Sequence, residues 1–108
     1  MDIRARDTDR ELLLEFSGEM DHHGARNALK EVEIAIDAAL PRSLILDFAG
    51  VTFMDSSGIG VLAGRYRKIS CFGGKVYVIH ANRRIRKILE MSGIGDIVEM
   101  IDQEEKHE

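Results

Sequence analysis

The chain has 108 residues, a formal net charge of −4 at pH 7 and a single cysteine, and 44 % of its residues are hydrophobic. This length fits one domain. The acidic balance argues against nucleic-acid binding, because neutralising phosphates needs clustered Lys and Arg. One cysteine excludes an internal disulfide and a Cys-based metal site. The N-terminus has no apolar signal segment, and no stretch approaches the ~18 apolar residues of a membrane helix, so we expect a cytoplasmic protein without membrane contact.

The first third of the chain predicts a hairpin followed by a long helix. Residues 11–17, ELLLEFS, are typical of a strand, which pairs with a shorter strand at residues 3–6 and ends at Gly18. Asp21 is a suitable N-cap for the helix that follows. Apolar residues then recur at spacings of three and four as far as Leu40, which is the pattern of one helix face, and Pro41 lies just past its end.

The remainder alternates strands and helices. SLILDF (43–48) predicts a strand buried on both faces, and residues 49–55 connect it to a second helix that ends at two glycines. KVYVI (75–79) predicts the next strand, Asn82 caps a third helix, and residues 97–101 predict a last strand. We therefore expect one α/β domain over residues 1–101, with a sheet mostly parallel after the hairpin and a polar tail over 102–108.

Chemistry centres on residues 53–69, FMDSSGIGVLAGRYRKI. Gly58, Gly60 and Ala63 fit the G-x-G-x-x-G/A pattern of dinucleotide-binding proteins. That fingerprint also requires an acid about 20 residues further on, after the next strand. The next strand here is followed by His80, Ala81 and Asn82, with no acid. The nucleotide interpretation is therefore weak, and we expect no cofactor.

A catalytic serine is less favoured still. Ser56 and Ser57 do not stand in the G-x-S-x-G pattern of a nucleophile elbow. Adjacent residues of a helix point about 100° apart, so His22 and His23 cannot chelate a metal together with Asp21. We expect neither an enzyme nor a metal site.

The third alternative is a serine that another enzyme modifies. The N-terminus of a helix has unpaired N–H groups and a favourable dipole for phosphate. Plain N-capping by one serine explains the residue type equally well. Gly60 and Gly64 lie inside the predicted helix, where each costs roughly 1 kcal/mol relative to alanine. Close approach of the helix to the sheet or to a partner is the simplest compensation.

The run MDSSGIGVLAGRYRKI resembles the signature of the anti-sigma factor antagonists of the STAS domain family. GEMDHH (18–23), GGKVYV (73–78) and ILEMSGI (88–94) resemble three further stretches of that family, in the same order. The resemblance covers nearly the whole chain. The double histidine is most similar to the branch that acts on the sporulation sigma factor F.

This resemblance implies a four- or five-stranded mixed sheet with helices mainly on one face, in a protein that is monomeric when free. It implies binding to an anti-sigma factor that is also an ATP-dependent serine kinase, with release of sigma factor F. The kinase phosphorylates the first serine of the DSSG motif, here Ser56, and a serine phosphatase restores the antagonist. The implied partner-binding residues are Asp21, Asp55, Ser57, Gly58, Ile59 and Gly60. There are two alternatives. One is an antagonist in a stress-response sigma factor pathway, and the other is a STAS-like sensor module that binds a small ligand or nucleotide.

Three further expectations concern single residues or faces. Tyr66 and Cys71 are expected to be buried. The third helix carries Arg83, Arg84, Arg86 and Lys87 near its start. Such a run is most often a solvated face, but positive charge early in a helix opposes the helix dipole, so its role stays open.

Overall fold

The computed structural model describes residues 1–71 and 73–101, with the side chains of residues 56, 57 and 61 excepted. In chain order, the elements are β1 (Asp2–Thr8), β2 (Glu11–Met20), α1 (His22–Ala39), β3 (Ser43–Met54), α2 (Ser56–Cys71), β4 (Lys75–Ile79), α3 (Arg83–Met91), the short 3-10 helix η1 (Ile94–Asp96) and β5 (Glu99–Ile101). This order confirms the predicted alternation. The expected polar tail over 102–108 lies outside the described residues, so the domain boundary stays a prediction.

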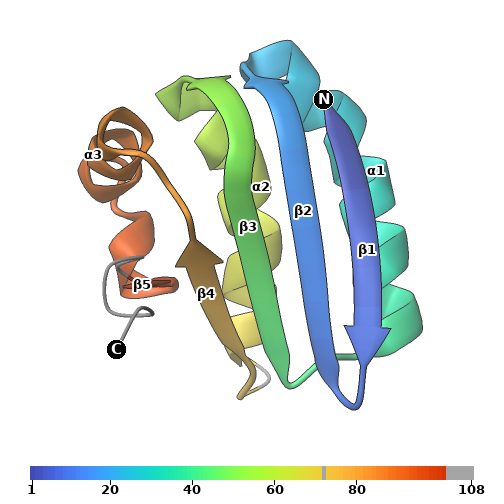
Figure 1. Ribbon diagram of the computed structural model, residues 1–108. Helices are drawn as coiled ribbons and strands as arrows, with labels where there is room; N and C mark the ends of the chain where they lie inside the picture. Colours follow the sequence, from blue (N-terminus) through green and yellow to red (C-terminus); the bar gives the residue numbers. More distant parts are fainter. Residues whose placement is uncertain (72, 102–108) are drawn as a thin grey trace.

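The strands form one mixed sheet in the order β1-β2-β3-β4-β5. β1 is antiparallel to β2, and the other neighbours are parallel. When parallel strands follow the chain order, right-handed crossovers place their helices on the same face. Figure 1 shows this arrangement, with α1 and α2 behind the sheet and α3 beyond the end of β4. The predicted α/β class, with a mixed sheet covered mainly on one face, is therefore confirmed.

Backbone hydrogen bonds fix the register where β2, β3 and β4 begin, at the side of the sheet opposite the N-termini of the helices. Asp9 and Arg10 join β1 to β2, and both have positive φ angles (42° and 70°), as a tight two-residue hairpin turn requires. The Arg10 carbonyl accepts the N–H of Arg42 at 2.8 Å, and the Arg42 carbonyl accepts the N–H of Lys75 at 2.9 Å. The starts of three strands are thereby tied together.

The core lies between the sheet and the helices. Phe16 of β2 and Phe48 of β3 meet edge to face, with ring centroids 5.3 Å apart. Tyr66 of α2 is 1 % exposed, so its predicted burial is confirmed, whereas Cys71 is exposed and the expectation for it was wrong. Fully burying one large apolar side chain contributes about 1.5–3 kcal/mol. The strand residues that alternate toward the helices and are buried include Leu12, Leu14, Leu44, Leu46, Val76 and Val78.

β3 is longer than predicted. It runs through Met54, so residues 49–55 are not a connection, and β2 likewise continues past Gly18 to Met20. The cause is a register shift: Glu15 pairs with Asp47, but Ser17 pairs with Gly50, which leaves an extra residue on β3. This bulge interrupts the alternation of apolar and polar residues that identifies a strand in a sequence.

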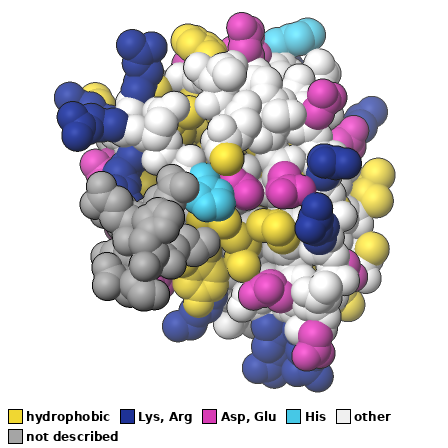
Figure 2. Space-filling model, viewed as in Figure 1, with side chains coloured by type: hydrophobic (Ala, Val, Ile, Leu, Met, Phe, Trp, Pro, Cys, Tyr) yellow, Lys and Arg dark blue, Asp and Glu magenta, His cyan; other side chains and the backbone are white. Residues whose placement is uncertain are grey.

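The second face of the sheet is not covered by a described helix. The side chains in the middle of this face are half-buried rather than fully buried, so the prediction that β3 is buried on both faces was only half right. Figure 2 shows apolar side chains in the middle of this face, with a histidine and acidic groups beside them. None of the described helices is long and apolar enough to cross a membrane. The half-buried side chains of this face are Leu13, Glu15, Ile45, Asp47, Tyr77 and Ile79.

Candidate partner-binding site

Two helix N-termini meet where β2 and β3 end. Met20 and Met54 are paired as the last residues of these parallel strands, and both are buried. Asp21 follows Met20 and precedes α1, while Asp55 follows Met54 and precedes α2. The N–H of Asp55 donates to the carbonyl oxygen of Met20 at 3.3 Å. The parallel pairing therefore places the two aspartates, and the two helix starts, at one edge of the sheet.

Both aspartates cap the helix that follows them. The Oδ1 atom of Asp21 accepts the N–H of Gly24 at 2.6 Å, and the Oδ1 atom of Asp55 accepts the N–H of Gly58 at 2.8 Å. A carboxylate at this position satisfies an orphan donor and is favoured by the helix dipole. The predicted N-cap role of Asp21 is thus confirmed. The bond to Gly58 N–H is made by Asp55, so it requires neither serine hydroxyl.

Gly58 brings the first turn of α2 against the start of α1. A Cβ atom on Gly58 would lie 2.8 Å from the carbonyl oxygen of Met20 and 3.0 Å from that of Asp21. Those atoms are backbone and cannot move aside easily, so this position requires glycine. Asp21, Asp55 and Gly58 are therefore brought together, as the predicted site needs.

Ser56 and Ser57 are the first two residues of α2. Their backbone lies beside the start of α1, but their side chains lie outside the described atoms. The roles assigned to both residues therefore stay predictions.

The adjacent residues Ile59 and Gly60 have different surroundings in the structure. The Ile59 side chain is 1 % exposed and belongs to the core, so the expectation that it contacts a partner is corrected: it anchors α2 to the sheet. Gly60 is exposed, and a Cβ atom there would have no other group within 4 Å; the same is true of Gly64. Close packing within the described chain therefore does not explain these two glycines.

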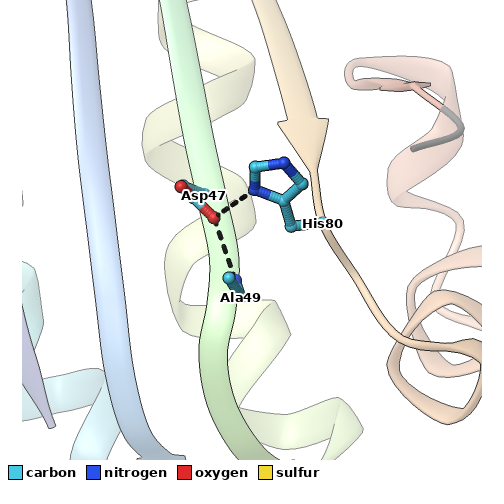
Figure 3. Close-up of polar contacts among 3 residues, drawn as sticks. All are labelled: Asp47, Ala49 and His80. Carbon is cyan, nitrogen blue, oxygen red and sulfur yellow. Dashed lines mark hydrogen bonds and ion pairs between the residues drawn. The ribbon is translucent and has the colours of Figure 1, made fainter. Parts of the chain in front are cut away.

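Sequence reasoning missed two features, one near this edge and one on the uncovered face of the sheet. Phe53 of β3 is 45 % exposed and lies two residues before Asp55. The sequence does not single it out, because it predicts a connection over residues 49–55. On the uncovered face, His80 Nδ1 lies 2.9 Å from Asp47 Oδ1, which also accepts the N–H of Ala49 at 2.9 Å (Figure 3). Asp47 and His80 are 33 residues apart, so only the strand register could have paired them.

Metal ligands do not gather in the part of the chain that the structure describes: no group of three or more His, Cys, Asp or Glu side chains there could hold an ion. His22 and His23 are exposed residues of the first turn of α1. They lie at the same edge as the two aspartate caps.

Comparison with known proteins identifies the family. The family model described as STAS domain matches residues 2–107. The anti-sigma F factor antagonist of Paenibacillus polymyxa is 36 % identical over 93 residues, which are 86 % of this chain and 80 % of that protein. The anti-sigma-B factor antagonist of Listeria monocytogenes is 26 % identical over 102 residues, which are 93 % of this chain and 86 % of that protein. These relatives are named as regulatory antagonists and not as enzymes.

Solved structures agree with the sequence relatives. The unphosphorylated form of the anti-sigma factor antagonist SpoIIAA is 26 % identical, with a TM-score of 0.75 and coverage of 97 % of this chain and 92 % of that chain. The phosphorylated form of the Bacillus SpoIIAA has a TM-score of 0.69 at 26 % identity and covers 97 % and 96 % of the two chains. The chain therefore belongs to the STAS domain family of anti-sigma factor antagonists.

Proposed function

We propose that this protein binds an anti-sigma factor that is also an ATP-dependent serine kinase, and so frees sigma factor F in the cytoplasm. Phosphorylation of Ser56 ends this binding, and a serine phosphatase restores it. The observation that carries the proposal is the position of Ser56, the first residue of α2, beside two capping aspartates at one edge of the sheet. Because Asp55 makes the capping bond to Gly58, the serine is not needed for that bond.

The switch is electrostatic in this proposal. A phosphate adds about −1.5 to −2 charges and is tolerated at a helix N-terminus, so the fold changes little. The same phosphate joins Asp55 and Asp21, so the edge becomes strongly negative toward a partner. Like charges facing each other across an interface cost several kcal/mol, and each 1.4 kcal/mol is about tenfold in affinity. Binding is therefore lost without refolding.

Gly60 and Gly64 support a partner surface that continues along α2. Both are exposed, and a Cβ atom at either position would meet nothing within 4 Å. Glycine inside a helix is destabilising by roughly 1 kcal/mol. Close approach of partner backbone to this face of α2 offsets that loss.

The assignment to sigma factor F rests on sequence. The double histidine His22 and His23 resembles the sporulation branch, and the relative named for sigma F is 36 % identical against 26 % for the relative named for sigma B. An antagonist in a stress-response sigma pathway is the alternative within the same mechanism.

The test uses purified anti-sigma factors of the sigma F and sigma B types from this protein's own organism. Each is incubated with the protein and ATP, and added phosphate is located by mass spectrometry. We expect phosphate on Ser56 with the sigma F type, absent in Ser56→Ala and retained in Ser57→Ala. Phosphate on another residue, or none with either factor, contradicts the proposal.

A ligand-sensing module is the second candidate. A groove of about 700 Å³ lies between the C-terminal halves of α1 and α2, at the opposite edge from Ser56. Its size is within the range of small-molecule sites. Its charged lining residues are Glu33, Asp37, Arg42, Arg65 and Lys68. Tight binding of ATP or GTP by the protein alone, lost in Arg42→Glu, would favour this function over partner switching.

A further inference from the structure

The charged residues of α3 are arranged against the helix dipole. Arg83 and Arg84 are its first two residues, Lys87 follows one turn later, and no acidic residue occurs in the first turn. Partial positive charge at a helix N-terminus favours acids there and disfavours cations. A face that served only to keep α3 solvated would gain stability from Asp or Glu at these positions. The chain carries cations instead, in a molecule whose net charge is −4.

These cations point away from the core. The buried side chains of α3 are Ile85 and Leu89, on the opposite side of the helix from Arg83 and Lys87, which are four residues apart and share one face. Arg83, Arg84 and Lys87 are exposed. None of the three forms an ion pair with another described residue. Arg86, in contrast, is half-buried and has an interaction partner within the molecule. The exposed group of Arg83, Arg84 and Lys87 is called the α3 basic patch below.

The fold brings the α3 basic patch toward the candidate site. β4 ends at Ile79, which lies beside Asp47, whereas β3 continues seven residues further to Met54. α3 fills the space that the short β4 leaves: it contacts both β3 and α2. Figure 1 shows it flanking the end of β3 from which α2 begins, and Figure 2 shows Lys and Arg side chains gathered over that corner. The patch is therefore a neighbour of the edge that carries Asp21, Asp55 and Ser56.

Resting on the proposed function, we infer that the α3 basic patch is a second part of the interface and binds an acidic surface of the same anti-sigma factor. The two parts of the interface have different electrostatic roles. The edge around Ser56 is acidic and becomes more so on phosphorylation, so it cannot attract an acidic partner segment. The α3 basic patch supplies a fixed attraction that phosphorylation does not remove. Complementary charge at an interface speeds association and sets register.

An acidic protein surface fits better than nucleic acid. Neutralising several phosphates needs a broad stripe of cations, but this chain has 19 acidic against 15 basic residues. The two aspartate caps and the acidic excess would repel a polyanion that extended beyond the patch. A compact cluster of carboxylates on a folded partner meets only the three cations.

The test reverses two charges of the patch in the full chain. Arg83→Glu with Lys87→Glu is compared with Arg10→Glu with Lys75→Glu, which changes the net charge equally at the opposite edge of the sheet. Each variant is used in its unphosphorylated form. Its affinity for the purified anti-sigma factor is measured at salt concentrations from about 50 to 500 mM. Thermal unfolding of both variants shows that they are folded. A milder pair, Arg83→Gln with Lys87→Gln, replaces the first if it does not fold.

We expect the patch variant to lose about tenfold or more in affinity at low salt, with a flatter salt dependence, and the opposite-edge variant to stay within about twofold of the unchanged protein. Equal losses in the two variants, or none, overturn the inference while leaving the proposed function intact. If the unchanged protein does not bind the anti-sigma factor, both the proposed function and this inference are overturned. That result comes from the unchanged protein alone, so the two failures can be told apart. Binding of duplex DNA that the patch variant loses would overturn the choice of an acidic protein partner.

Discussion

His80 Nδ1 lies 2.9 Å from Asp47 Oδ1 and ties the end of β4 to the centre of β3. The same carboxylate oxygen accepts the N–H of Ala49, the residue at the bulge that re-aligns β3. Asp47 also lies directly beside Glu15 in the sheet, and Glu15 has Arg6 3.8 Å away. Each of these two adjacent carboxylates thus has a basic side chain beside it, His80 for Asp47 and Arg6 for Glu15. This arrangement lets the uncovered face carry charge in the middle of a sheet.

The backbone of His80 provides the first prediction. Its φ angle is 63°, in the left-handed region that favours glycine. His80→Ala loses the contact with Asp47 and keeps the strained backbone, whereas His80→Gly loses the same contact and relieves the strain. We expect the glycine variant to be about 1 kcal/mol more stable than the alanine variant. Urea unfolding of both measures the difference, and equal stabilities would show that the turn is not strained.

Much of the fold could be predicted from the sequence because local signals carried it. Periodic apolar residues identified the three helices, and Asp21 and Asn82 were found as caps from residue type and position. Asn82 does accept the N–H of Ile85 at 2.9 Å. The family resemblance followed from the run MDSSGIGVLAGRYRKI, together with three further short stretches of consecutive residues in the same order.

The parts that failed depend on the three-dimensional arrangement. The end of β3 was missed because a bulge breaks the alternation of its side chains. Ile59 is assigned to partner contact from its place in the motif, although its side chain is buried on the apolar face of α2. The pairing of Asp47 with His80 needs the register of two parallel strands, which no local pattern reveals.

The two glycines of the DSSG-x-G stretch are expected to behave oppositely. Gly58→Ala places a methyl group 2.8 Å from the Met20 carbonyl oxygen, so the backbone must shift and stability should fall by about 1–3 kcal/mol. Gly60→Ala meets nothing within 4 Å, so helix propensity should raise stability by up to about 1 kcal/mol. Thermal or urea unfolding of both variants compares the two positions.

Stability and partner affinity are expected to change in opposite directions when Gly60 is replaced. If a partner approaches this face of α2 closely, Gly60→Ala weakens binding while it stabilises the fold, and Gly60→Leu weakens binding further. Isothermal titration with the anti-sigma factor measures this. A stabilised Gly60→Ala variant with unchanged affinity would remove α2 from the interface.

Asp55 combines a capping role with a charge, and two substitutions separate them. Asp55→Ala removes the acceptor for the Gly58 N–H and should lower stability by about 1 kcal/mol. Asp55→Asn keeps an acceptor, so its stability should lie within about a few tenths of a kcal/mol of the unchanged protein. Asp55→Asn also removes one negative charge beside the proposed phosphate. We therefore expect its phosphorylated form to retain more affinity for the anti-sigma factor than phosphorylated wild-type protein. Identical losses on phosphorylation would exclude an electrostatic contribution from Asp55.

The Tyr66 hydroxyl is buried without a hydrogen-bond partner among the described residues. A buried polar group in this state is unfavourable by about 1–3 kcal/mol. Tyr66→Phe removes the hydroxyl and keeps the ring, so stability at neutral pH should be unchanged or raised by up to about 1 kcal/mol. A loss larger than about 1 kcal/mol in urea unfolding would show that the hydroxyl has a partner in solution.

The same burial predicts how stability responds to alkaline pH. Burial disfavours the phenolate, so it raises the pKa of Tyr66 above the ordinary value of about 10. The unfolded chain then releases this proton more readily than the folded protein. The contribution of Tyr66 to stability is therefore complete below about pH 10 and declines as the pH rises toward the raised pKa. Denaturant unfolding at several pH values between about 8 and 11.5 should show this decline in the wild-type protein. Tyr66→Phe, which has no phenol at this position, should show a shallower decline, and identical pH profiles would mean that the Tyr66 phenol ionises equally well in the folded and unfolded states.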